Sequence, residues 1–258
     1  MLINSKLNIH HSTLLFAGLC GAAWVALLWG GGPVHMHVAG AGGLLAFAAG
    51  WAVMTAAMML PTAAPLTLLF ARLVRRRPDR RWLVALLLLG YLAAWLLFGL
   101  VARAGYAALD ALAAAWISPP AWAVSAALLG LAGLYQFSPL KYRCLDECRS
   151  PMHVITAHWT GRDYRRQALL LGAHHGLFCV GCCWALMLLM FAVGAGSQGW
   201  MLALATAMGL EKNAPWGRRL GPPLGALLLA GALFVLLSAT LLPPAGPADA
   251  LYQWICRR

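Results

Sequence analysis

The chain has 258 residues, of which 62% are hydrophobic and only 10% are charged. A soluble domain carries about 25% charged residues, so this composition excludes an ordinary soluble protein and indicates an integral membrane protein. The net charge of +12 does not indicate nucleic-acid binding, because the basic residues form short blocks between apolar runs. Such blocks are typical of cytoplasmic loops. The seven cysteines lie mostly in or beside apolar runs, which excludes a secreted disulfide framework.

Apolar runs separated by polar or Gly/Pro-rich breaks recur along the whole chain. They predict an all-α bundle of about seven transmembrane helices that forms a single domain over residues 1–258. The first run is longer than the apolar region of a signal peptide, and no clean cleavage site follows it, so we expect a retained helix. The expected spans are 13–29, 44–69, 82–101, 121–139, 168–194, 200–215 and 224–242.

The basic residues predict the orientation of these spans. With the N-terminus in the cytoplasm, seven spans place every lysine and arginine on the cytoplasmic side except Arg103, Arg257 and Arg258. Positively charged loops stay in the cytoplasm, so we expect a cytoplasmic N-terminus and a periplasmic C-terminus. The lipid bilayer is then the first partner of the chain.

A thiol-rich stretch lies within the fifth expected span, between His174 and Met190. At about 100° per residue, one helical sector of about 140° contains six of its side chains, whereas His174 points elsewhere. These six are His175, Cys179, Cys182, Cys183, Met187 and Met190. Soft sulfur ligands select Cu(I) and, less strongly, zinc. Cysteine and methionine are also ordinary packing residues, so the alternative is an apolar helix face without a ligand.

Methionines precede a pair of prolines in the second span. Met54, Met58 and Met59 are followed by Pro61 and Pro65, and proline kinks a transmembrane helix. At comparable membrane depth these thioethers would meet the thiols if the two helices pack together. Packing residues are the alternative interpretation.

Two further groups of candidate ligands would lie at the outer and inner ends of a copper path through the membrane. His35-Met36-His37 in an outer loop combines imidazole and thioether groups, which can hold copper in transit, although a solvated loop explains it equally well. Cys144 and Cys148, in the polar segment from Lys141 to Arg166, would share a face if that segment is helical. The Cys-x-x-x-Cys spacing indicates a pair of thiols that could capture a soft metal ion. A structural pair of cysteines is the alternative.

A third feature, Glu211-Lys212, follows the sixth apolar run. The sequence leaves open whether the two residues pair within the membrane or cap the span at its cytoplasmic face.

Four phrases together resemble a known family: Met54-Thr-Ala-Ala-Met-Met-Leu-Pro61, the segment Pro139 to Pro151, Gly176 to Trp184, and Glu211-Lys212. They resemble domain-of-unknown-function family 2182, predicted metal-binding membrane proteins likened to a membrane copper chaperone for a bacterial polyphenol oxidase. The resemblance implies copper handling at the bacterial inner membrane and delivery to an exported copper enzyme or a periplasmic copper carrier. It implies a ligand set of Met54, Met58, Met59, Cys144, Cys148, Cys179, Cys182 and Cys183. His35 and His37 lie outside the matched phrases.

Three functions compete for this sequence. The first is a non-enzymatic Cu(I) chaperone or permease; no phosphate-binding Gly-x-x-x-x-Gly-Lys-Ser/Thr loop supplies ATP-driven transport. The second is a membrane thiol oxidoreductase that uses Cys179-Val-Gly-Cys182 and the Cys144/Cys148 pair. The third is an assembly subunit with ordinary cysteines. Replacing the methionines would separate the first two, because methionine adds nothing to thiol exchange.

Overall fold

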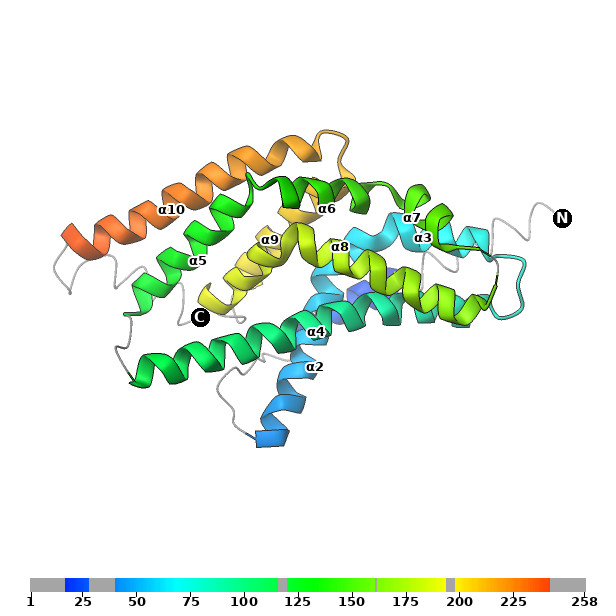
Figure 1. Cartoon of the computed structure of the whole chain (residues 1–258), viewed down its shortest axis with the longest axis horizontal. Coiled ribbons are helices and arrows are strands. Elements are labelled where there is room, and N and C mark those ends of the chain that lie inside the picture. Colours follow the sequence, from blue (N-terminus) through cyan, green and yellow to red (C-terminus); the bar gives the residue numbers. More distant parts are fainter. Residues whose placement is uncertain (1–16, 28–39, 116–119, 161, 194–197, 242–258) are drawn as a thin grey trace. The chain divides into compact units, whose positions relative to one another are not determined.

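The computed structural model describes residues 17–27, 40–115, 120–160, 162–193 and 198–241, and within them the chain is helical and contains no strand (Figure 1). A short apolar helix covers Ala17–Leu27. The helices that follow are α2 (Gly40–Met59), η1 (Pro61–Ala63), α3 (Ala64–Leu73), α4 (Arg80–Ala115), α5 (Ala121–Tyr135), α6 (Pro139–Arg149), α7 (Pro151–His158), α8 (Tyr164–Val193), α9 (Gln198–Asn213), η2 (Gly217–Leu220) and α10 (Gly221–Leu241). The predicted all-α class is confirmed.

Four stretches of the described residues are long and apolar enough to cross a membrane: Gly42–Met59, Arg80–Leu112, Tyr164–Met190 and Gly217–Leu241. A fifth arises if α5 and α6, which are bent by 65° at a short break, count as one span. Of the first expected span the structure describes the helix Ala17–Leu27, and α9 has 16 residues, slightly fewer than the about 17 that usually cross a bilayer. Seven spans and the orientation of the termini therefore remain predictions.

Prolines interrupt the second expected span where the sequence predicted a kink. Helix α2 ends at Met59, and a 3-10 turn begins at Pro61 before α3 continues. Pro61 cannot donate a backbone hydrogen bond, which ends the α-helical ladder. The hydroxyl of Thr62 donates to the carbonyl oxygen of Met59 at 2.8 Å, and so satisfies one carbonyl at the helix end.

One other expected boundary differs from the structure. Helix α4 continues through residues 102–115, beyond the expected end of the third span at residue 101. This segment is rich in alanine and leucine, the strongest helix formers. The polar segment expected between the fourth and fifth spans contains α6 and α7, so Cys144 and Cys148 do share one helix.

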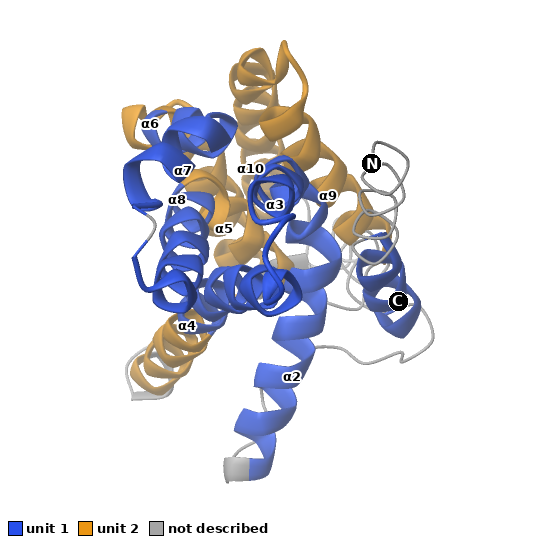
Figure 2. Cartoon of the chain, turned by 90° about the vertical axis from the view of Figure 1, so that its right-hand side faces the viewer, with its two compact units in different colours: residues 1–99, 143–181 blue, residues 100–142, 182–258 orange. Residues whose placement is uncertain are grey.

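The chain divides into two compact units, each described here by itself (Figure 2). Unit 1 comprises residues 1–99 and 143–181, and unit 2 comprises residues 100–142 and 182–258. Helices α4, α6 and α8 run from one unit into the other, and α8 passes from unit 1 to unit 2 between Gly181 and Cys182.

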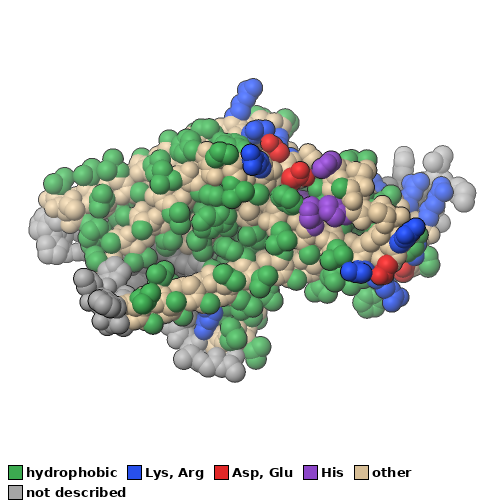
Figure 3. All heavy atoms as spheres, in the orientation of Figure 1, with side chains coloured by type: hydrophobic (Ala, Val, Ile, Leu, Met, Phe, Trp, Pro, Cys, Tyr) green, Lys and Arg blue, Asp and Glu red, His purple; other side chains and the backbone are tan. Residues whose placement is uncertain are grey.

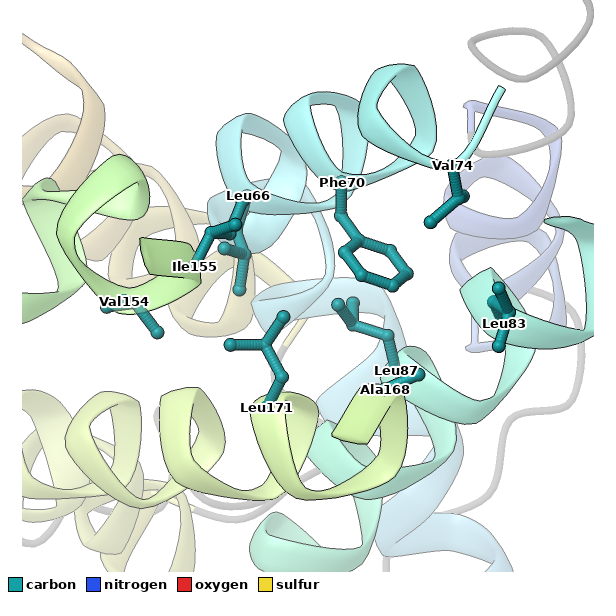
Figure 4. Close-up of a cluster of buried hydrophobic side chains, with 9 residues drawn as sticks. All are labelled: Leu66, Phe70, Val74, Leu83, Leu87, Val154, Ile155, Ala168 and Leu171. Carbon is teal, nitrogen blue, oxygen red and sulfur yellow. The ribbon is translucent and has the colours of Figure 1, made fainter. Parts of the chain in front are cut away.

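An apolar core in unit 1 joins four helices, α3, α4, α7 and α8 (Figure 4). Phe70 is fully buried at its centre, and Trp159 packs edge-on against the Phe70 ring, with 5.0 Å between the ring centroids. The remaining members are Leu66, Val74, Leu83, Leu87, Val154, Ile155, Ala168 and Leu171. This core holds the first half of α8 against α4.

Glycines allow the backbones of α4 and α8 to approach closely within unit 1. A Cβ atom at Gly172 would lie 2.7 Å from the carbonyl carbon of Leu87, and one at Gly176 would lie 2.9 Å from the carbonyl oxygen of Tyr91. Gly90 on α4 makes the reciprocal approach, 2.8 Å from the Ala173 nitrogen. Gly172 and Gly176 have the Gly-x-x-x-Gly spacing of close helix pairs in membranes. This contact determines which α4 side chains reach the thiol-rich face of α8.

A charged turn joins α3, α4 and α8 at one end of unit 1. Arg77 forms an ion pair with Asp79 at 2.9 Å, and its guanidinium lies 3.6 Å from the ring centroid of Tyr164, the first residue of α8. The hydrogen bond from Arg77 lowers the pKa of the Asp79 carboxyl. The stabilisation that the charged Asp79 carboxylate provides is therefore fully present above the pKa that this group has in the unfolded chain. It is lost as the pH falls through the lower pKa of Asp79 in the folded chain.

Unit 2 is built around the packing of α5 against α10. Gly133 on α5 lies against Leu229, and Gly225 on α10 lies against Phe137 and Gln136. At Gly221, where α10 begins, a Cβ atom would lie 2.7 Å from the hydroxyl of Tyr142. The start of α10 is thereby held close to the beginning of α6.

Candidate metal-binding site

Helix α8 carries the predicted thiol face as one unbroken helix, and this face is buried. Cys179, Cys182 and Cys183 are each 1% exposed. The spacing of three and four residues places Cys179 beside Cys182 and Cys183 on one side of the helix. The other members of the sector, His175, Met187 and Met190, are buried as well. His174, which we expected to point elsewhere, is partly exposed.

Tyr91 of α4 contacts the first thiol of this face, within unit 1. Its hydroxyl oxygen lies 2.9 Å from Cys179 Sγ and 3.2 Å from the carbonyl oxygen of Met59. A carbonyl only accepts, so when the hydroxyl donates to Met59 the thiol donates to Tyr91. When the sulfur is a thiolate or is bound to a metal, the hydroxyl can turn and donate to it. The Tyr91 hydroxyl proton can therefore be donated either to the Met59 carbonyl oxygen or to the Cys179 sulfur.

His175 lies beside Tyr91 in unit 1. Its ring stacks on the Tyr91 ring, with 5.9 Å between the centroids and 29° between the planes, and its side chain is 3% exposed. An imidazole one helical turn before Cys179 places a nitrogen donor beside a thiol. The sequence predicted His175 and Cys179 but missed Tyr91, because nothing in the spacing of α4 marks it. The Gly172-x-x-x-Gly176 pattern was the available signal for a close helix contact.

The methionine segment lies in unit 1 and is fully buried. Met54, Met58 and Met59 are each at most 1% exposed, as core side chains or internal ligands would be. Through the Met59 carbonyl and Tyr91, the end of α2 is two hydrogen bonds away from Cys179. The sequence left the packing of these two helices as a hypothesis, and here the Met59 carbonyl oxygen and the Tyr91 hydroxyl connect the end of α2 to Cys179.

Cys144 of α6 lies directly against α8 within unit 1. A Cβ atom at Gly181 would lie 2.6 Å from Cys144 Sγ, so the absence of a side chain at Gly181 makes room for this thiol. Cys144 is 8% exposed, and Cys148 one turn later is partly exposed. The structure therefore places Cys144 against Gly181, which lies between Cys179 and Cys182 in the sequence.

A buried ion pair lies in unit 2. Lys141 Nζ is 2.6 Å from Glu211 Oε1, and the two side chains are 0% and 3% exposed. Lys141 also donates to the side-chain carbonyl of Gln136, which is 1% exposed. Lys141 belongs to the polar segment expected between the fourth and fifth spans, and on α6 it is a buried cation. Glu211 pairs with Lys141, a residue 70 positions away.

Lys212 is the second buried cation of unit 2. It is 7% exposed, and its ammonium group lies 3.6 Å from Cys183 Sγ. A positive charge beside a sulfur stabilises the thiolate, which is the form that binds metal and acts as a nucleophile. Glu211 and Lys212 thus contact different partners although they are adjacent in the chain.

The structure does not assemble all the predicted ligands. No group of three or more His, Cys, Asp or Glu side chains in the described part of the chain has a geometry that could hold a metal ion. The six cysteines within the described ranges, which exclude Cys256, are in the thiol form. His35 and His37 lie outside the described residues.

The fold and these buried groups define a class: an all-helical protein with several helices apolar enough for a membrane and with thiol, thioether and imidazole groups in its interior. The sequence profile of the PpoB2 family, described as a copper chaperone, matches residues 48–235. The chain therefore belongs to the PpoB2 copper chaperone family, which confirms the resemblance drawn from the four phrases. No match is found among curated proteins or among solved structures.

Proposed function

We propose that the chain is a Cu(I) chaperone of the bacterial inner membrane that passes copper to an exported copper enzyme or a periplasmic carrier. Cu(I) would be held on α8 by thiolates of Cys179, Cys182 and Cys183, with methionines and His175 as neighbouring donors. Soft thiolate and thioether ligands suit Cu(I) better than harder ions. The observation that carries the proposal is the burial of three thiols on one helix face in a chain of a copper chaperone family.

The groups around the thiols support this function over inert packing. Tyr91 contacts Cys179 and Lys212 contacts Cys183, so two of the three sulfurs have a polar neighbour in the interior. Partners that hydrogen-bond to a ligand fix its orientation and tune the bound metal. An apolar core needs neither a buried hydroxyl nor a buried ammonium at these places.

The Lys212 ammonium in unit 2 supports a thiolate at Cys183. The two groups are buried, and Lys212 Nζ lies 3.6 Å from Cys183 Sγ. The negative charge of a thiolate is favoured beside a buried positive charge. Copper bound to two thiolates is an anionic group, so the same ammonium favours the loaded state.

The test is Cu(I) binding by the purified full-length chain in detergent, under anaerobic reducing conditions and in competition with a chelator. We expect the wild-type chain to bind at least one ion, and the Cys179→Ser, Cys182→Ser, Cys183→Ser variant to lose it. Serine is nearly isosteric, so the helical far-UV spectrum should be unchanged. Cys20→Ser is the matched control, because Cys20 lies on the separate Ala17–Leu27 helix.

Stoichiometric copper in a folded triple-serine chain would reject this site. If the wild-type chain binds no copper, a reversible disulfide between Cys179 and Cys182 becomes the next measurement, because thiol exchange is then the better explanation. Replacing Met54, Met58 and Met59 with leucine distinguishes the two functions in either case. A copper site should weaken, whereas a redox pair should not change.

We expect Tyr91→Phe to weaken Cu(I) binding by about 10- to 100-fold, the usual effect of removing a partner of a metal ligand. The phenyl ring keeps the packing, and only the hydroxyl between Cys179 and Met59 is lost. Chelator competition measures the change. Tyr164→Phe is the control, since it removes a hydroxyl from the first residue of α8. An unchanged affinity for Tyr91→Phe would show that Cys179 needs no positioning.

We expect Gly181→Ala to displace the thiol of Cys144, because the new methyl group would lie 2.6 Å from its sulfur. The thiol is the end of a short side chain that can rotate, so the stability cost should be about 1 kcal/mol. Alkylation of Cys144, followed by mass spectrometry, should become faster. Gly209→Ala on α9 is the control, because nothing lies within 4 Å of the position that its Cβ would take, and it should leave the rate of Cys144 alkylation unchanged.

A further inference from the structure

Two histidines outside the thiol face pack against each other in unit 1. His158 ends α7 and His174 lies on α8, and their ring centroids are 4.0 Å apart with 42° between the planes. Both rings are partly exposed. Figure 3 shows histidine side chains gathered beside carboxylates on the face turned to the viewer. This pair has no role in the fold core or at the thiol face.

The hydrogen bond of His158 defines which of its nitrogens is available. Its Nδ1 lies 3.0 Å from the carbonyl oxygen of Val154, one helical turn earlier. The carbonyl only accepts, so Nδ1 carries the proton and donates. In the neutral ring, Nε2 then keeps its lone pair. Metal-binding histidines use this arrangement, in which one nitrogen donates to the protein and the other faces the ion.

His174 has an unsatisfied nitrogen at the same place. Its Nδ1 is buried, and no hydrogen-bond partner for it exists among the described residues. Leaving a buried polar atom without a hydrogen-bond partner lowers stability, which is a cost to the fold. The ring is held between His158 and Phe178, whose centroid lies 4.8 Å away, edge-on. A metal ion that accepts the lone pair of this nitrogen would remove the cost of leaving it unpaired.

We propose that His158 and His174 form an imidazole site for a copper ion, distinct from the thiols of α8. Imidazole is a good ligand for copper and zinc. The two ring planes are tilted by 42°, and a shared ion needs each ring to present an edge nitrogen at about 2.0 Å. Rotation of two partly exposed side chains supplies that change.

The proposal rests on the proposed function only in naming copper as the cargo. His174 precedes His175 on α8, so the site would load an ion at the surface of unit 1, next to the buried donor pair of His175 and Cys179. Nitrogen ligands accept Cu(II), whereas thiols are oxidised by it. Cu(II) is therefore a probe that separates this site from the thiol site.

The test uses the full-length chain with Cys179, Cys182 and Cys183 replaced by serine, titrated with Cu(II) in detergent. We expect one ion with a nitrogen hyperfine pattern in its electron paramagnetic resonance spectrum, and at least tenfold weaker binding in His158→Gln and in His174→Gln. His153→Gln is the matched control. His153 is a histidine of α7 whose exposed side chain pairs with Glu147 at 3.3 Å.

A second measurement keeps the histidines intact, in case a variant does not fold. The wild-type chain is treated with diethyl pyrocarbonate, with and without Zn(II), and modification is located by mass spectrometry. Selective protection of His158 and His174 supports the site. Equal modification with and without Zn(II), or unchanged Cu(II) binding by folded His158→Gln and His174→Gln, overturns it. If the wild-type chain bound no Cu(I) at the thiols but still bound Cu(II) at His158 and His174, only the proposed function would be rejected.

Discussion

Replacing Glu211 with glutamine is expected to lower the free energy of unfolding by about 3–5 kcal/mol, the usual cost of breaking a buried ion pair. The amide keeps the shape but removes the carboxylate that pairs with the fully buried Lys141. Two ammonium groups, Lys141 and Lys212, would then lie in the interior of unit 2 without that countercharge. Equilibrium unfolding in mixed detergent micelles, followed by tryptophan fluorescence, measures the loss.

A double variant distinguishes a broken pair from a general packing defect. Replacing Lys141 with methionine together with Glu211→Gln removes both charges, and we expect it to recover most of the lost stability, because a buried pair is often no better than apolar side chains. The coupling energy follows from the double-mutant cycle. Asp79→Asn is the control, since Asp79 pairs with Arg77 on the surface and exposed pairs contribute little. Additive effects of the two buried substitutions would contradict the ion-pair explanation.

Replacing Gly172 with alanine should destabilise unit 1 by about 3 kcal/mol or more, at the upper end of overpacking effects. The new methyl group would lie 2.7 Å from the carbonyl carbon of Leu87 and 3.0 Å from its Cα. Backbone atoms cannot rotate away, so α4 and α8 must separate. That separation also withdraws Tyr91 from Cys179, so we expect weaker Cu(I) binding in the same variant.

Gly105→Ala is the matched control on α4, because nothing lies within 4 Å of the position that its Cβ would take. In an exposed helix this substitution should stabilise by about 0.5–1 kcal/mol. Thermal unfolding followed by circular dichroism compares the two variants. If Gly172→Ala were as stable as the wild-type chain, the close contact between α4 and α8 would be wrong.

The buried ion pair joins one residue that the sequence singles out and one that it does not. Glu211 is conspicuous as a carboxylate after an apolar run, but Lys141 belongs to a segment with many charges and looks like its neighbours. Only the bend between α5 and α6 places Lys141 in the interior. The pair therefore depends on a tertiary contact over 70 positions, which local composition does not contain.

The amino-acid sequence by itself determined the helical class, the long apolar segments, the proline break after Met59 and the thiol face of α8. Each of these follows from local composition or from the periodicity of one helix, which neighbouring residues specify. Only the tertiary structure decided that Tyr91 contacts Cys179, that Cys144 lies against Gly181, and that Lys212 lies beside Cys183. Those contacts join residues far apart in the chain, and they depend on helix approach distances that side-chain volumes at a few glycines control.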